Sequence, residues 1–246
     1  MEEEIKLLKL KFNKIKKMGW IESERTDYGA IGVTFEKLIG VTTNDFEIPD
    51  FGSIEIKTKS KSKFDYVNLF NCVPTGPYYH EVDRIKDLFG YPDSKLNKFK
   101  VLNGEVFCNK LTKIGNKFYF KLNIYKNKKR ITLSIFDRQN HKIEENTYWD
   151  FDVLEEKLNR KLTYLALINA DKKIVNGKNF FKYNTLSLYR LKGFDTFINL
   201  MENDFIKITF KLGVFRDKKR LGKIHDRGTA FSIKEQNINK LFDFIE

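Results

Sequence analysis

The spacing of apolar residues predicts helices near both ends of the chain. Residues 3–17 place apolar side chains three or four positions apart with lysines between them, which indicates a surface helix with one buried stripe. A short helix is expected at residues 35–39, just before a glycine. Ser232 and Glu235 have the spacing of a capping box, so we expect them to open a last helix that reaches residue 245.

Strands are predicted where apolar and polar residues alternate. The alternation at residues 117–125 resumes at 131–135 after a lysine-rich turn, which is typical of a hairpin with a basic tip. A helix at 153–162 leads into an apolar strand at 164–168, and this step suits an α/β core. Further expected elements are a strand at 51–57, a tight turn at Asn176-Gly177, a helix at 194–201 and a strand at 206–212.

Charge and composition narrow the range of partners. The 246 residues include 46 Lys+Arg and 33 Asp+Glu, and the formal net charge of +13 favours an anionic partner. Hydrophobic residues make up 41%, enough for a sizeable core, yet no apolar run approaches the roughly 18 residues of a membrane span. The N-terminus lacks the apolar stretch of a secretory signal, so a cytoplasmic location without membrane contact is expected. Cys72 and Cys108 are too few for a disulfide framework and are expected to fill the core.

The segment with the clearest chemistry reads Asp-x4-Glu-x-Lys and places Asp50, Glu55 and Lys57 at the strand predicted for 51–57. Because side chains alternate along a strand, Glu55 and Lys57 project to one side, and Asp50 at the strand's entrance can reach that side. Two converging carboxylates bind Mg²⁺ through oxygen, and a nearby lysine can position water and offset charge on a phosphate. This pattern predicts metal-assisted phosphodiester hydrolysis. An ordinary ion-pair surface on a strand would show the same spacing, but Glu36 on the preceding helix could complete a metal site.

These segments resemble a known group of enzymes, the MutH-like branch of the PD-(D/E)xK nucleases, and within it the family of MvaI and BcnI restriction endonucleases. The resemblance lies within residues 29–59 and at 225–231, in the segments Gly32-x-Thr34-Phe35-Glu36-Lys37-Leu38-Ile39-Gly40, Pro49-Asp50-Phe51, Ile54-Glu55-Ile56-Lys57-Thr58-Lys59 and His225-Asp226-Arg227-Gly228-Thr229-Ala230-Phe231. It implies a Type II restriction endonuclease that hydrolyses phosphodiester bonds of double-stranded DNA at a short CC-N-GG site, with CCWGG favoured, leaving 5′-phosphate and 3′-hydroxyl ends.

The resemblance also implies a cofactor and a set of ligands. Mg²⁺, as one ion or two, would be bound by Asp50, Glu55 and the backbone carbonyl of Ile56. Lys57 would assist the attacking water, and Glu36 would support the metal site from its helix. A monomer with one active site is expected, together with a cognate DNA methyltransferase in the same system that forms no stable complex with it.

The fold class expected from the pattern and the resemblance is α/β (α+β). A PD-(D/E)xK core, with a mixed sheet flanked by helices, would form a catalytic lobe from residues 1–90 and 146–178. A mainly β recognition lobe would comprise residues 91–145 and 179–246, with the DNA cleft between the lobes.

The basic segment from Arg216 to Gly228 is the predicted DNA-reading region. Arginine can donate to guanine O6 and N7, and an aspartate can accept from cytosine N4. The residues expected to contact DNA are His225, Asp226, Arg227, Arg216, Lys219, Arg220 and, beyond the strand at 51–57, Lys59. A basic loop that only meets solvent would look similar. Two other functions stay open from the residues: a MutH-like enzyme that nicks one strand, and a noncatalytic nucleic-acid-binding module.

Overall fold

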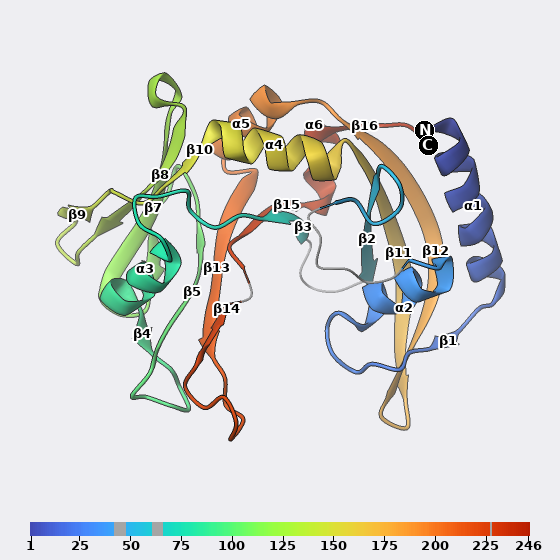
Figure 1. Ribbon diagram of the computed structural model, residues 1–246, viewed down its shortest axis with the longest axis horizontal. Helices are drawn as coiled ribbons and strands as arrows, with labels where there is room; N and C mark the ends of the chain where they lie inside the picture. The colour runs from blue at the N-terminus through green and yellow to red at the C-terminus, as the bar shows by residue number, and fades with distance from the viewer. Residues whose placement is uncertain (42–47, 61–65, 227) are drawn as a thin grey trace. The chain divides into compact units, whose positions relative to one another are not determined.

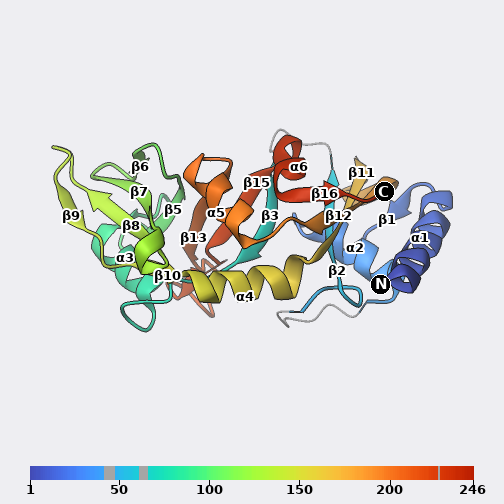
Figure 2. The same ribbon diagram turned by 90° about the horizontal axis from the view of Figure 1, so that it is seen from above.

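The structure is a computed structural model that describes residues 1–41, 48–60, 66–226 and 228–246. The chain forms two compact units, each built from separate stretches (Figure 1; Figure 2). Unit 1 comprises Met1–Asp65, Lys157–Gly193 and Ile238–Glu246, and unit 2 comprises Tyr66–Glu156 and Phe194–Asn237.

Unit 1 is a mixed sheet with helices. Its strand order is β1-β12-β11-β2, with β16 paired to β12; β2 runs parallel to β11, whereas β12 is antiparallel to its partners. The strands are β1 (Ile21–Glu22), β2 (Ile54–Ser60), β11 (Tyr164–Val175), β12 (Lys178–Leu191) and β16 (Phe242–Phe244). The helices are α1 (Glu2–Lys17), α2 (Ala30–Ile39) and α6 (Ile238–Leu241).

The core of unit 1 lies between the sheet and the pair α1 and α2 (Figure 1). The apolar stripe of α1 and the buried side of α2 meet alternate residues of β2, β11 and β12. The buried members include Leu8, Phe12, Phe35, Ile54, Ile56, Ala166, Ile168 and Tyr183. Because Ile54 and Ile56 point into this core, the intervening residues of β2 must point to the opposite face of the sheet.

Unit 2 is mainly β. One sheet has the order β10-β8-β7-β6 with β9 paired to β8, and the other has the order β3-β15-β13-β5-β4 with β14 paired to β13. The strands of the first sheet are β6 (Thr112–Ile114), β7 (Phe118–Tyr125), β8 (Arg130–Phe136), β9 (Lys142–Glu144) and β10 (Tyr148–Asp150). The strands of the second are β3 (Tyr66–Asn71), β4 (Tyr91–Pro92), β5 (Lys100–Val106), β13 (Ile206–Val214), β14 (Ile224–Asp226) and β15 (Ala230–Lys234).

Helices accompany both units. Helices α3 (Glu81–Phe89) and α5 (Phe194–Glu202) belong to unit 2, as do short 3₁₀ helices at Lys126–Lys128 and Glu235–Asn237. Helix α4 (Phe151–Leu162) begins in unit 2 and ends in unit 1. In the part of the chain that the structure describes, no helix is long and apolar enough to cross a membrane.

The predicted fold class is confirmed: one unit has a mixed sheet with flanking helices, and the other unit is mainly β. The basic-tipped hairpin is β7 and β8, and the helix-then-strand step is α4 and β11. The turn at Asn176-Gly177 joins β11 to β12, and both turn residues have positive φ, 49° and 78°. Cys72 and Cys108 are both buried, as expected of core fillers.

The prediction of a helix from Ser232 to residue 245 is wrong for most of its length. Ser232 lies in β15, whose residues pair with β3 on one side and with β13 on the other. These pairings bury Phe231 and Ile233 completely, so tertiary contacts outweigh the local capping signal. Helix α6 is one turn long and gives way to β16, which adds to the edge of β12.

The division of the chain into units differs from the lobe boundaries expected from the sequence. Residues 66–90 and 146–156 fall in unit 2, and residues 179–193 and 238–246 fall in unit 1. Strand pairing explains the difference: β3 pairs with β15 in unit 2, while β12 pairs along its length with β11 in unit 1. Which unit cuts DNA and which reads it stays a prediction, as does a cleft between lobes.

Candidate functional site

Strand β2 carries Glu55 and Lys57, two of the predicted catalytic residues, on the face of the sheet opposite α1 and α2. In the parallel pairing, Glu55 lies beside Leu165 of β11 and Lys57 lies beside Leu167. Both leucines are buried, and the C-terminal part of α4 supplies Lys161 to the same face. Glu55 is therefore a carboxylate in largely apolar surroundings, and its side chain is only 1% exposed.

The two oxygens of Glu55 have different environments. Oε1 accepts a hydrogen bond from Nζ of Lys57, and Nζ of Lys161 lies 3.6 Å from the same oxygen. Oε2 is buried and, among the residues that the structure describes, has no hydrogen-bond partner. A buried carboxylate oxygen without a partner is costly and rare, and one explanation is a ligand that occupies the site during function.

Burial raises the pKa of the Glu55 carboxyl above its ordinary value. The charge of Asp50 adds to this rise, whereas the ammonium groups of Lys57 and Lys161 oppose it. Loss of hydration thus outweighs the two nearby cations. A divalent cation at Oε2 would favour the ionised carboxylate, because its positive charge would offset the hydration that the carboxylate loses on burial.

Asp50 is brought to this point by a tight turn. The backbone groups of Phe51 and Ile54 bond to each other, N–H to carbonyl in both directions, at 3.0 and 2.9 Å. Gly52 within the turn has φ of 59°, a left-handed conformation that glycine adopts without strain. The turn lets Oδ2 of Asp50 accept a hydrogen bond from the Ile56 N–H at 2.9 Å. Asp50 is thereby fixed next to the strand residue that follows Glu55.

These residues fit a hard divalent cation. Asp50, Glu55 and the backbone of Ile56 lie together, and the unpartnered Oε2 of Glu55 offers the kind of oxygen that Mg²⁺ binds while keeping several waters. Among the described residues, no three His, Cys, Asp or Glu side chains lie close enough together to bind a metal by themselves. A metal site here would therefore rest on two carboxylates with backbone and water oxygens.

Glu36 lies on α2, on the other side of β2 from Glu55. A Cβ added to Gly32 would lie 3.5 Å from Glu36 Oε1 and 3.2 Å from Thr58 Oγ1, so Glu36 faces the same point as Thr58. Thr58 belongs to the alternating set that points toward α2. The charge of Glu36 and, above all, burial raise the pKa of Tyr183. The supporting role of Glu36 stays a prediction.

Lys161 was not predicted from the sequence. It stands in the last turn of α4, where basic side chains are common because they complement the helix dipole. Its closeness to Glu55 depends on the packing of α4 on the sheet, and the residue types around it carry no signal for that contact.

The residues expected to read DNA lie in unit 2, apart from Lys59 at the end of β2 in unit 1. His225 and Asp226 are on β14, which pairs with the end of β13. Lys219 is exposed in the loop between these strands. Oδ1 of Asp226 accepts a hydrogen bond from the Gly228 N–H at 2.6 Å. Arg227, the remaining member of the predicted set, lies outside the described residues.

Aromatic stacking orders the loop between β13 and β14. The rings of Phe215 and His225 are stacked, with centroids 4.2 Å apart and planes 14° from parallel. The guanidinium of Arg220 lies 3.8 Å from the Phe215 ring centroid and also pairs with Asp217. Arg216 pairs with Asp93 at 2.7 Å. Two of the predicted arginines and the predicted histidine therefore have fixed positions.

The carboxylates and lysines gathered at β2 suit a nuclease, and comparison with known proteins gives the family. The MvaI/BcnI restriction endonuclease family model matches residues 9–242. The solved complex of the restriction endonuclease MvaI with its cognate DNA substrate is 32% identical, with a TM-score of 0.92 over 100% of this chain and 98% of that chain. MvaI in the absence of DNA has the same identity and coverage and a TM-score of 0.62. Among curated proteins none matches.

The chain belongs to the MvaI/BcnI restriction endonuclease family. It is accordingly a Type II site-specific endonuclease, a DNA-binding hydrolase of a restriction system. The resemblance found in the motif blocks is confirmed. Family membership also decides between the enzyme and the noncatalytic binding module in favour of the enzyme.

Proposed function

We propose that this endonuclease hydrolyses double-stranded DNA in a Mg²⁺-dependent reaction at a CC-N-GG site, with CCWGG favoured. Water attacks phosphorus and the bond to the 3′ oxygen breaks, which leaves 5′-phosphate and 3′-hydroxyl ends. A monomer with one active site would cut the two strands in separate events. The observation that carries the proposal is the buried Glu55, with one oxygen beside two lysines and the other without a hydrogen-bond partner in the described part of the chain.

The residues have separate roles in this proposal. Asp50, Glu55 and the Ile56 carbonyl bind Mg²⁺, as one ion or two, and Glu36 supports the site from α2. Bound Mg²⁺ supplies Lewis-acid stabilisation of charge on the phosphate. Lys57, already hydrogen-bonded to Oε1 of Glu55, orients the attacking water and offsets developing charge. Lys59 and the basic residues of unit 2 contact the DNA.

The test is digestion of unmethylated circular plasmid by the purified protein with Mg²⁺ or with EDTA, followed by sequencing of every new DNA end. Double-strand ends that need Mg²⁺ and share one CC-N-GG site are expected. Digestion that stops at nicked circles would instead support a MutH-like nicking enzyme. Intact plasmid under every condition would overturn the proposal. A cognate methyltransferase is expected to protect the same site.

Lys161 is expected to act as a positioning residue for Glu55. Replacing it by methionine removes the cation 3.6 Å from Oε1, so Glu55 loses one of the two groups that orient it. The expected result is a fall of about 10- to 100-fold in the single-turnover cleavage rate, typical of residues that orient metal ligands. A higher Mg²⁺ concentration for half-maximal rate should accompany the fall.

Two variants make the Lys161 experiment specific. Lys161→Arg keeps the charge and should recover most of the rate. Arg160→Met removes a neighbouring cation from the exposed side of the same helix turn and should leave both quantities unchanged. A parental rate in Lys161→Met would show that Lys57 alone orients Glu55.

A further inference from the structure

Strands β11 and β12 continue past the end of β2 and form a two-stranded arm, residues 171–182 (Figure 1). The pairing of β11 with β2 reaches Ala170, which lies opposite Ser60 at the end of β2. Strand β11 then runs on to Val175, which pairs with Lys178 of β12 at the turn. The arm therefore extends the sheet beyond the strand that carries the candidate catalytic residues.

One face of the arm continues the face of the sheet that carries Glu55. Ala170 of β11 belongs to the core under α1 and α2, so Lys173, three residues further on, lies on the opposite face. Phe181 of β12 belongs to the same core, and its neighbour Lys182 therefore lies on the opposite face as well. Lysines of the arm thus follow the candidate catalytic face.

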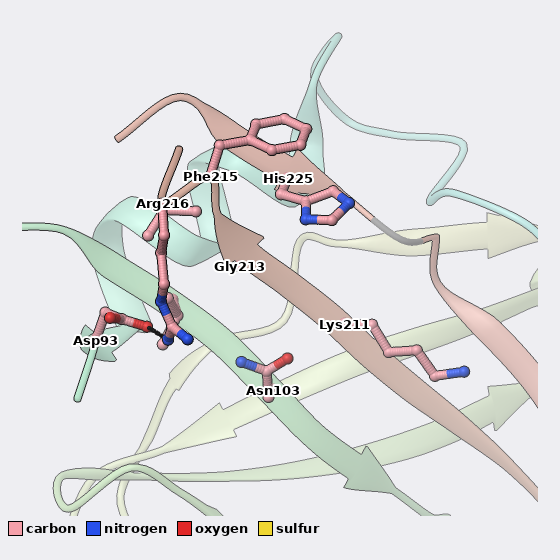
Figure 3. Close-up of a pocket in the computed structure, with 9 residues that line it drawn as sticks. Asp93, Asn103, Lys211, Gly213, Phe215, Arg216 and His225 are labelled. Atoms are coloured by element: carbon pink, nitrogen blue, oxygen red, sulfur yellow. Dashed lines mark hydrogen bonds and ion pairs between the residues drawn. The ribbon is translucent and has the colours of Figure 1, made fainter. Parts of the chain in front are cut away.

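Aromatic rings hold Lys173 in place without neutralising its charge. Its ammonium group lies 4.4 Å from the ring centroid of Trp20 and 5.7 Å from that of Phe180. The rings attract the cation but carry no net charge, so the ammonium keeps its full positive charge. Arg216 of unit 2 is held differently, because it pairs with the carboxylate of Asp93 (Figure 3). Lys173 is thus an ordered cation that can still pair with an anion.

The arm as a whole is positive and has an apolar tip. Four lysines and one aspartate give residues 171–182 a net charge of +3. Lys178 pairs with Glu22 outside the arm, in an exposed ion pair of the kind that contributes little to stability and can exchange partners. At the tip, Ile174 and Val175 are both exposed. A positive ribbon of this kind suits the phosphate and sugar edges of a duplex.

The arm lies too far along the sheet to take part in the chemistry at β2. Lys57 lies beside Leu167, and Lys173 follows Leu167 by six residues, which is about 20 Å along an extended strand. The five base pairs of a CC-N-GG site extend over only about 17 Å of duplex. A lysine at this distance from Lys57 is therefore expected to meet phosphates outside the recognised base pairs.

We propose that the arm binds the sugar-phosphate backbone of duplex DNA outside the target site, with Lys173 and Lys182 paired to phosphates. The contact is independent of base sequence. It helps an enzyme that cuts the two strands in separate events, because DNA held outside the site stays with the protein between the cuts. The proposal rests on the proposed function and extends it, since it assigns contacts with flanking DNA to named residues.

The experiment compares two duplexes that contain a CC-N-GG site, one with flanks of about three base pairs and one with flanks of about fifteen. Binding constants are measured with Ca²⁺ in place of Mg²⁺ over a range of salt concentrations. In Lys173→Gln/Lys182→Gln, binding to the long duplex should weaken by about 10-fold, and the slope of log K against log salt should fall by about two. Binding to the short duplex and its single-turnover cleavage rate with Mg²⁺ should stay unchanged.

The matched control is Lys6→Gln/Lys14→Gln, which removes two exposed lysines from α1, on the other side of the sheet. It lowers the net charge by the same amount and should bind both duplexes as the wild type does. Equal losses on the short and long duplexes in Lys173→Gln/Lys182→Gln, or no loss on either, would overturn the proposal. So would wild-type self-association that this variant abolishes, because the arm would then bind a second copy of the chain.

A long duplex without any CC-N-GG site separates this proposal from the proposed function. Because the arm's contact does not depend on base sequence, Lys173→Gln/Lys182→Gln should weaken binding to this duplex as well, by a similar factor. Wild-type protein that fails to cut any duplex would count against the proposed function, while the length dependence of binding would still test the arm.

Discussion

Asp50→Ala is expected to abolish DNA cleavage while leaving DNA binding intact. Asp50 is held beside Glu55 by its hydrogen bond to the Ile56 N–H, so its removal takes away one of two carboxylates from the metal site. A bound metal contributes several kcal/mol to charge stabilisation, which corresponds to a loss of about 100- to 10,000-fold in rate. The measurement is single-turnover cleavage with Mg²⁺, together with a gel-shift assay with Ca²⁺ on the same DNA.

Two further variants separate the metal role from a structural one. Asp50→Asn keeps an acceptor for the Ile56 N–H and therefore the turn, but it loses the charge, so its cleavage should fall nearly as far. Asp243→Ala removes an exposed carboxylate of unit 1 and should leave the rate unchanged. Cleavage at the parental rate in Asp50→Asn would show that Asp50 serves only the turn.

The local part of this site could be predicted from the sequence because strand geometry is local. A period of two fixes that Glu55 and Lys57 share a face, whatever the rest of the chain does. The pattern did not show how deeply Glu55 is buried, since its burial comes from β11, at Leu165, and from α4. Lys161 and Asp93 were missed for the same reason: each acts through a partner distant in the sequence.

The fold class could be predicted from the sequence, but the pairing of strands and the unit boundaries could be predicted less well. Helices and hairpins with strong periodicity were found, since neighbours along the chain supply their pattern. The segment at Ser232 shows the opposite case. Strands β3 and β13 pair with it on either side, and these contacts outweigh its local capping signal. The unit boundaries depend on the long pairing of β11 with β12, and pairing length is not encoded in any local motif.

Glu55→Gln is expected to abolish cleavage as Asp50→Ala does, and in addition to stabilise the metal-free protein at neutral pH. The pKa of Glu55 is raised above its ordinary value by burial, so the folded state binds a proton more tightly than the unfolded state does. The contribution of Glu55 to stability is then fully present below its ordinary pKa and is lost as pH rises through the raised pKa. Glutamine carries no charge and escapes this loss.

The two proteins should therefore have similar melting temperatures in acid, and the variant should melt at the higher temperature once the pH exceeds the raised pKa. Thermal melts from acid to neutral pH in EDTA measure this, with Glu22→Gln, an exposed carboxylate paired with Lys178, as the control that shows no such divergence. Adding Mg²⁺ at neutral pH should raise the melting temperature of the wild type only, because ligand binding to the folded state stabilises it. A variant that gains no stability, and a wild type that Mg²⁺ does not stabilise, would together show that Oε2 of Glu55 is not a metal ligand.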